Sequence, residues 1–107
     1  MERDVIRGRL DMMLLAVLEG APGHGYAIIE ELAQRSGGEV TLAEGTVYPA
    51  LYRLERQKLV SSTWSSAAGR RRRIYQLTGA GRKALGEQRS AWRLFVRTVD
   101  GVLGGAE

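Results

Sequence analysis

The residue types that enzymes use most often for chemistry are scarce in this sequence. Its 107 residues include no cysteine and one histidine, His24, which falls in a glycine-rich turn. Without a thiol or a second imidazole, the chain offers neither a Cys/His metal cluster nor a nucleophile paired with a base. We therefore expect no enzymatic activity, no metal and no cofactor, and we interpret His24 as an exposed turn residue.

The strongest chemical signal is a run of four consecutive cations: Arg70, Arg71, Arg72 and Arg73. Guanidinium groups form planar forks that match phosphates and guanine edges. The chain as a whole has a formal net charge of +4 and an isoelectric point near 10.0. An anionic polymer is the expected partner, although a GC-rich genome also enriches arginine, and a solvated charge run remains the alternative.

The overall composition is that of a small folded domain. Hydrophobic residues make up 44% and charged residues 26% of the chain, and about 100 residues suit one domain with a modest core. No apolar run approaches the roughly 20 residues that span a bilayer, and the charged start does not resemble a signal peptide. These features predict a cytoplasmic protein that has no membrane partner.

Hydrophobic periodicity predicts three helices ahead of the arginine run. Residues 5–19 repeat apolar side chains every three to four positions, and the following Gly-Ala-Pro-Gly sequence ends that helix. Residues 26–35 show the same spacing and end at Ser-Gly-Gly. Thr41 and Glu44 have the spacing of a capping box, which predicts that a third helix begins there.

The third helix is expected to have one apolar face and one polar face. At about 100° per residue, the apolar positions Val47, Ala50, Leu51 and Leu54 fall on one side. The opposite side carries Gly45, Pro49, Tyr52, Arg53 and Arg56.

The remaining sequence predicts a hairpin and a long final helix. Residues 61–65 and 71–77 favour strands joined by a tight turn, with the arginines near its tip. Alternation turns Tyr75 and Leu77 inward, and we expect Trp64 to cap the hydrophobic core. Thr78 is expected to cap a helix with a seven-residue pattern at Leu85, Gln88, Trp92, Phe95, Val99 and Val102.

This order of elements predicts a mainly α fold with a small β-hairpin: a winged helix-turn-helix followed by a C-terminal dimerisation helix. We divide the chain into a DNA-binding domain (1–78), the dimerisation helix (79–103) and a frayed tail (104–107).

Three segments of the sequence resemble the PadR family of bacterial transcriptional regulators. They are Gly25-Tyr26, the run EGTVYPALYRLE at residues 44–55, and GRRRRIYQLT at residues 69–78. The resemblance extends over about residues 8–99. It implies the compact branch of that family, in which one C-terminal helix forms the homodimer.

In such a protein the third helix would enter the major groove and the hairpin would lie along the backbone or minor groove. We expect Thr46, Tyr48, Pro49 and Tyr52 near base edges and sugars. Phosphate contacts would come from Tyr26, Arg53, Arg56 and the four arginines of the hairpin. Core packing remains the alternative for the three tyrosines.

The last helix is predicted to pair with a second copy, because a monomer would expose its apolar face. Leu85, Gln88, Trp92, Phe95 and Val99 are the expected dimer and ligand-pocket residues. Two-fold symmetry then predicts a pseudo-palindromic operator. The resemblance further implies a planar aromatic effector that stacks on Trp92 and releases a repressor from DNA, with ordinary packing of Trp92 as the alternative.

Two other functions remain open at this point. The winged helix could serve as a protein-interaction module, because a fold alone does not fix a function. The chain could also be a hydrophobic-ligand-binding protein, built around Trp92, that has no operator.

Overall fold

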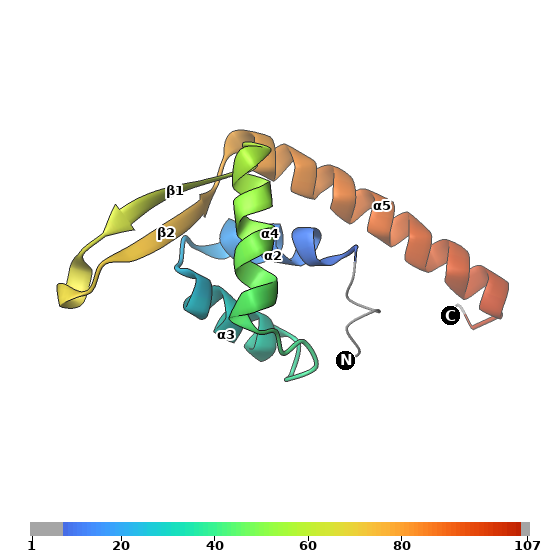
Figure 1. The fold of residues 1–107 in the computed structure, drawn as a ribbon. Helices are drawn as coiled ribbons and strands as arrows, with labels where there is room; N and C mark the ends of the chain where they lie inside the picture. Colours follow the sequence, from blue (N-terminus) through green and yellow to red (C-terminus); the bar gives the residue numbers. More distant parts are fainter. Residues whose placement is uncertain (1–7, 106–107) are drawn as a thin grey trace.

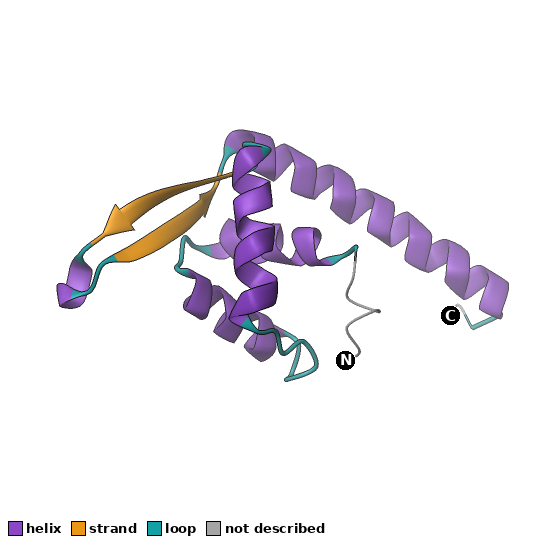
Figure 2. Ribbon diagram, viewed as in Figure 1, coloured by secondary structure: helices purple, strands orange, loops and turns teal. Residues whose placement is uncertain are grey.

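The computed structural model describes residues 8–105, so the first residues of the predicted first helix, 5–7, lie outside the described residues. Helices and a single hairpin make up the described chain, and the last helix extends well beyond the rest (Figures 1 and 2). The elements in chain order are α2 (Leu10–Gly20), α3 (Gly25–Arg35), α4 (Glu44–Arg56), β1 (Val60–Ser65), the short 3-10 helix η1 (Ala67–Gly69), β2 (Arg72–Leu77) and α5 (Gly79–Leu103).

The arrangement confirms the predicted helix-turn-helix, hairpin and long terminal helix. Strands β1 and β2 are antiparallel, with Val60 opposite Leu77 and Ser65 opposite Arg72. The hairpin projects away from the helices, and α5 leaves its base on the other side (Figure 1). An additional bridge between Gly23 and Tyr75 attaches the turn before α3 to β2.

One hydrophobic core joins every helix to the base of the hairpin. The apolar face predicted for the third helix is buried, and Tyr75 and Leu77 face inward as expected. Leu85 is also part of this core and is only 1% exposed. The core consists of Leu14, Leu15, Val17, Leu18, Ile28, Leu32, Val40, Val47, Ala50, Leu51, Leu54, Val60, Tyr75, Leu77 and Leu85.

The burial of Leu85 corrects its assignment to the dimer face. Its spacing fits the seven-residue pattern of α5, but the first turns of this helix rest on the protomer's own core. Gly81, one turn earlier, packs so closely that a Cβ there would lie 2.1 Å from the Leu59 carbonyl oxygen. The part of α5 that a partner could cover therefore starts after Leu85.

Two helix starts are capped by side chains, and neither is at α4. Thr78 accepts a hydrogen bond from the Gly81 amide at 3.0 Å at the start of α5, as predicted. The predicted capping box of α4 is wrong, because the N-cap is Ala43, two residues later than the box requires. Thr41 instead donates to the Gly38 carbonyl at 3.1 Å within the preceding loop.

Candidate nucleic-acid interface

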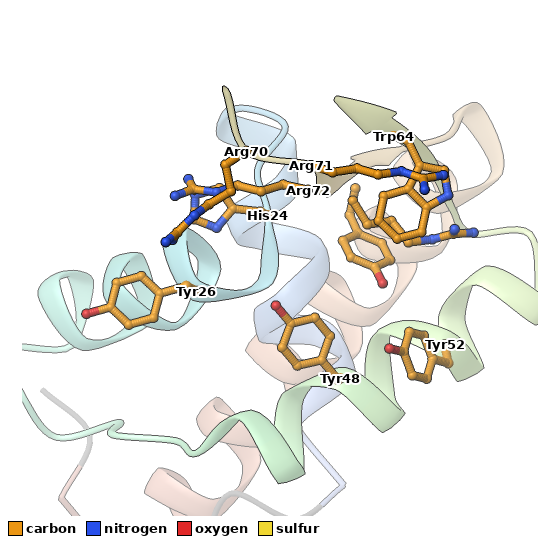
Figure 3. Close-up of a pocket in the computed structure, with 10 residues that line it drawn as sticks. His24, Tyr26, Tyr48, Tyr52, Trp64, Arg70, Arg71 and Arg72 are labelled. Carbon is orange, nitrogen blue, oxygen red and sulfur yellow. The ribbon is translucent and has the colours of Figure 1, made fainter. Parts of the chain in front are cut away.

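A hollow lies where the start of α3, the outer face of α4 and the hairpin meet (Figure 3). Its volume is about 540 Å³, and none of the described residues that line it is acidic. Five aromatic rings, one imidazole and four guanidinium groups form its walls: Tyr26, Tyr48, Tyr52, Trp64, Tyr75, His24, Arg70, Arg71, Arg72 and Arg73. We call this surface the basic cavity.

Trp64 lies in the basic cavity, so the prediction that it caps the hydrophobic core is wrong. Its side chain is 54% exposed. Trp64 pairs with Arg73 in the sheet, in the same alternation as the inward pair Val60 and Leu77. The hairpin projects away from the helices (Figure 1). The inward face of its outer part, which carries Trp64, therefore lines the cavity and not the core.

The ring of Trp64 organises two of the four arginines. The guanidinium carbon of Arg71 lies 4.3 Å from the Trp64 ring centroid, and that of Arg73 lies 5.2 Å from it. Such cation–π contacts hold a guanidinium in place without neutralising its charge. Arg73 also pairs with Glu55 on α4 at 3.3 Å, whereas Arg71 remains exposed.

His24 is the N-cap of α3 and not an exposed turn residue as predicted. Its Nδ1 accepts a hydrogen bond from the Ala27 amide at 3.2 Å, and its side chain is partly buried. Its Nε2 lies 2.8 Å from a guanidinium nitrogen of Arg72. A residue of α3 and a residue of the hairpin thus meet at one imidazole, with Arg70 and Arg72 beside it in Figure 3.

The three tyrosines of the cavity differ in how firmly they are held. Tyr48 is half-buried, and its ring lies so close to Gly25 that a Cβ there would come within 2.3 Å of the Tyr48 Cζ. Burial raises the pKa of the Tyr48 phenol, and the nearby Glu44 carboxylate raises it further. Tyr26 and Tyr52 are 56% and 47% exposed, so core packing does not account for them.

Four of the residues predicted to bind DNA do not line the cavity. Arg53 forms an ion pair with Asp11 of α2. Arg56 and Pro49 are exposed elsewhere on α4, and Thr46 is half-buried. A role in DNA binding stays a prediction for these four residues, as it does for the seven that line the cavity.

A second aromatic group, outside the lining of the basic cavity, lies near the middle of α5. The rings of Trp92 and Phe95 have centroids 5.9 Å apart. The guanidinium carbon of Arg9 lies 5.3 Å from the Trp92 centroid and 5.9 Å from that of Phe95. Exposed apolar side chains continue along the helix from this group, and they are Leu94, Val102 and Leu103.

A helix-turn-helix with a cationic wing defines the class of winged-helix transcriptional regulators. Residues 14–87 match the sequence profile described as the transcriptional regulator PadR-like family. The chain belongs to this family, which confirms the resemblance. Transcriptional regulator Rv3488 of Mycobacterium tuberculosis is 44% identical over 78 residues, which cover 73% of this chain and 70% of that protein.

Solved structures of similar proteins agree with this assignment. A PadR family transcriptional regulator from Eggerthella lenta is 31% identical, with a TM-score of 0.83 over 94% of this chain and 86% of that one. A transcriptional regulator from Clostridium thermocellum is 28% identical, with a TM-score of 0.84 over 92% and 96% of the two chains. Regulators of the PadR family bind DNA and are generally dimeric. Within the described residues, no helix is long and apolar enough to cross a membrane.

Proposed function

We propose that the protein is a homodimeric repressor that binds a pseudo-palindromic operator through the basic cavity and the adjoining face of α4. The observation that carries this proposal is the lining of the cavity, where four arginines converge and none of the described lining residues is acidic. Arginine side chains that stay exposed can neutralise backbone phosphates, and this contact is independent of sequence.

Base recognition would come from the N-terminal half of α4. Thr46, Tyr48, Pro49 and Tyr52 lie on this helix, whose apolar face is buried in the core. A helix held in this way can enter a major groove about 12 Å wide with its other face. Arg53 and Arg56 lie further along α4, where they would meet flanking phosphates if Arg53 exchanges its ion pair with Asp11 for one with DNA.

Dimerisation is supported by where the large apolar side chains are exposed. Among the described residues they fall into two groups: the three aromatic residues Tyr26, Tyr52 and Trp64 in the cavity, and five residues of α5. A solvent-exposed stripe of this kind on a 25-residue helix favours a partner of the same type. Gln88, Trp92, Phe95 and Val99 would form the interface, and the unit that binds DNA would be residues 1–78.

Trp92 and Phe95 could also hold a planar aromatic effector near the two-fold axis. Their rings are partly exposed, and aromatic faces stack well on planar ligands. Binding there would release DNA if the ligand prefers a dimer whose recognition helices are wrongly spaced. In a Trp64→Phe variant, Trp92 is the one remaining tryptophan, so quenching of its fluorescence by acridine tests this part of the proposal.

The test of DNA binding is a titration of the protein against the DNA upstream of its own gene over a series of salt concentrations. A scrambled duplex of equal length is the control. We expect specific binding by a dimer, with an affinity that falls steeply with salt, and a slope that decreases by about one for Arg70→Ala. Equal weak binding to both duplexes would overturn the proposal and favour a protein-interaction module.

A further inference from the structure

The contact between His24 and Arg72 contains a conflict of hydrogen-bond donors. A neutral imidazole has one N–H group and one lone pair, and its charged form has no lone pair. Nδ1 of His24 accepts from the Ala27 amide at 3.2 Å, so the proton of the neutral ring is on Nε2. The Arg72 nitrogen 2.8 Å from Nε2 can only donate.

Neither donor has another acceptor among the described residues. The Ala27 amide lies in the first turn of α3, where no earlier helical carbonyl is available to it. Within residues 8–105, Arg72 forms no ion pair, whereas Arg73 beside it pairs with Glu55. If the imidazole lone pair stays with α3, the His24 N–H and the Arg72 guanidinium face each other at 2.8 Å as two donors at one place.

A negatively charged oxygen at that place would accept from both groups. Hydrogen bonds from a cation to an oxyanion are among the strongest in proteins, and the start of a helix adds favourable potential. Another polar group without a partner belongs to the lining of the same cavity, beside Arg73 and Tyr52. The hydroxyl of Tyr75, a residue that is 0% exposed and lines the cavity, has no hydrogen-bond partner among the described residues.

We propose that His24 Nε2–H and Arg72 together bind one phosphodiester oxygen of the DNA backbone, and so connect α3 to the wing across a single phosphate. This inference rests on the proposed DNA-binding function and adds His24 to the residues that contact the backbone. The helix cap would fix which ring nitrogen of His24 donates to the phosphate. The Tyr26 and Tyr48 rings border the same place (Figure 3).

The first test uses variants that separate the cap from the donor. In His24→Asn the amide oxygen can still cap α3, because asparagine is a preferred N-cap residue, but the shorter side chain no longer presents the imidazole Nε2–H. We expect an unchanged thermal unfolding midpoint and a roughly tenfold loss of operator affinity with an unchanged salt slope. Arg72→Gln should lose at least as much affinity and lower the slope by about one.

The double variant His24→Asn/Arg72→Gln tests whether the two residues share one phosphate. Residues that share a ligand are not additive, so we expect a smaller loss than the product of the two single losses. Losses that multiply, or operator binding by His24→Asn equal to that of the wild type, would overturn the inference. The wild-type titration beside them tests the proposed function, so the two failures are distinguishable.

The second test observes the imidazole directly, because His24 is the one histidine of the chain. A ¹H–¹⁵N spectrum of its ring nitrogens is recorded with and without operator duplex at the same pH. We expect a proton on Nε2 that shifts downfield and exchanges more slowly when operator duplex is added. A cap without a ligand role would leave this signal unchanged, which would overturn the inference. A shift with inorganic phosphate but none with duplex would overturn DNA as the occupant.

Discussion

Both tryptophans of the protein lie against arginine side chains, but their surroundings differ. Trp64 has the guanidinium groups of Arg71 and Arg73 over its ring and lies in a cavity with two further arginines. Trp92 has Arg9 over its ring, and the large apolar side chains Leu94, Phe95, Val102 and Leu103 are exposed after it on α5. The two sites lie on different elements, Trp64 on β1 of the hairpin and Trp92 on α5.

The comparison shows that neighbours, and not the tryptophan itself, decide what each site can bind. At Trp64 the ring arranges cations whose charge is still available, which suits a polyanion. At Trp92 the ring is the largest member of an apolar stripe, which suits a second copy of the same stripe. Exchange of Trp64 should therefore affect DNA binding and leave the dimer unchanged, whereas exchange of Trp92 should act directly on the dimer and on DNA binding only through it.

The largest expected effect is that of Trp92→Ala on the dimer. A large aromatic side chain at the centre of an interface contributes about 2 kcal/mol or more, and two-fold symmetry doubles this contribution. We expect the dissociation constant of the dimer to rise about a thousandfold, as measured by sedimentation equilibrium over a concentration series.

Gly86→Ala is the matched control for Trp92→Ala. A Cβ at Gly86 meets nothing within 4 Å, so this change on the same helix should only favour the helical state. The dissociation constant of the Gly86→Ala dimer should equal that of the wild-type dimer. An unchanged constant for Trp92→Ala would place the interface elsewhere.

Local periodicity was sufficient to predict most of the fold. The buried face of α4 and the inward direction of Tyr75 follow from spacing alone, because burial against one core imposes the period of the element. Leu85 and Trp64 have the correct spacing for their predicted roles but the wrong distance from the core. How far a hairpin or a helix extends past the core depends on the packing of other elements, and a local pattern does not contain this information.

The site was less predictable than the fold, and His24 is the clearest case. One histidine between two glycines matches no motif, and its function as a cap depends on where Ala27 and Arg72 lie in space. Gly25, in contrast, belongs to a recognisable motif, whose physical reason is the Tyr48 ring that lies against it. The four arginines were predicted as one group, but only the structure separates Arg73, which pairs with Glu55, from the other three.

The second prediction concerns Trp64→Ala and is smaller. Each cation–π contact contributes about 0.5–1 kcal/mol, so release of Arg71 and Arg73 should lower operator affinity by roughly tenfold. The salt slope should stay unchanged, because both charges remain. The free energy of unfolding should change by less than about 0.5 kcal/mol, as for other exposed side chains.

Trp64→Phe is the control for this variant, since it keeps a ring face for the two guanidinium groups. In the same salt-series titration, Trp64→Phe should keep most of the operator affinity that Trp64→Ala loses. If Trp64→Ala instead lowers the free energy of unfolding by several kcal/mol, the residue belongs to the core after all.

The smallest effect at neutral pH is expected for Tyr75→Phe, on the buried side of the same hairpin. The Tyr75 hydroxyl is buried without a partner among the described residues, and its removal should stabilise the free protein by up to about 1 kcal/mol. Burial also raises the pKa of the Tyr75 phenol to about 12.

The raised pKa of Tyr75 predicts the direction in which the free energy of unfolding changes with pH. A folded-state pKa near 12 against about 10 in the unfolded chain means that the folded state holds the phenol proton more tightly. Its contribution is complete below about pH 10 and is lost as the pH rises toward about 12. Urea unfolding at a series of alkaline pH values should show a smaller decline for Tyr75→Phe than for the wild type. Equal declines would mean that the hydroxyl meets water in the cavity, and the contrast between the exposed Trp64 and the buried Tyr75 of one hairpin would then be weaker than their side-chain exposures indicate.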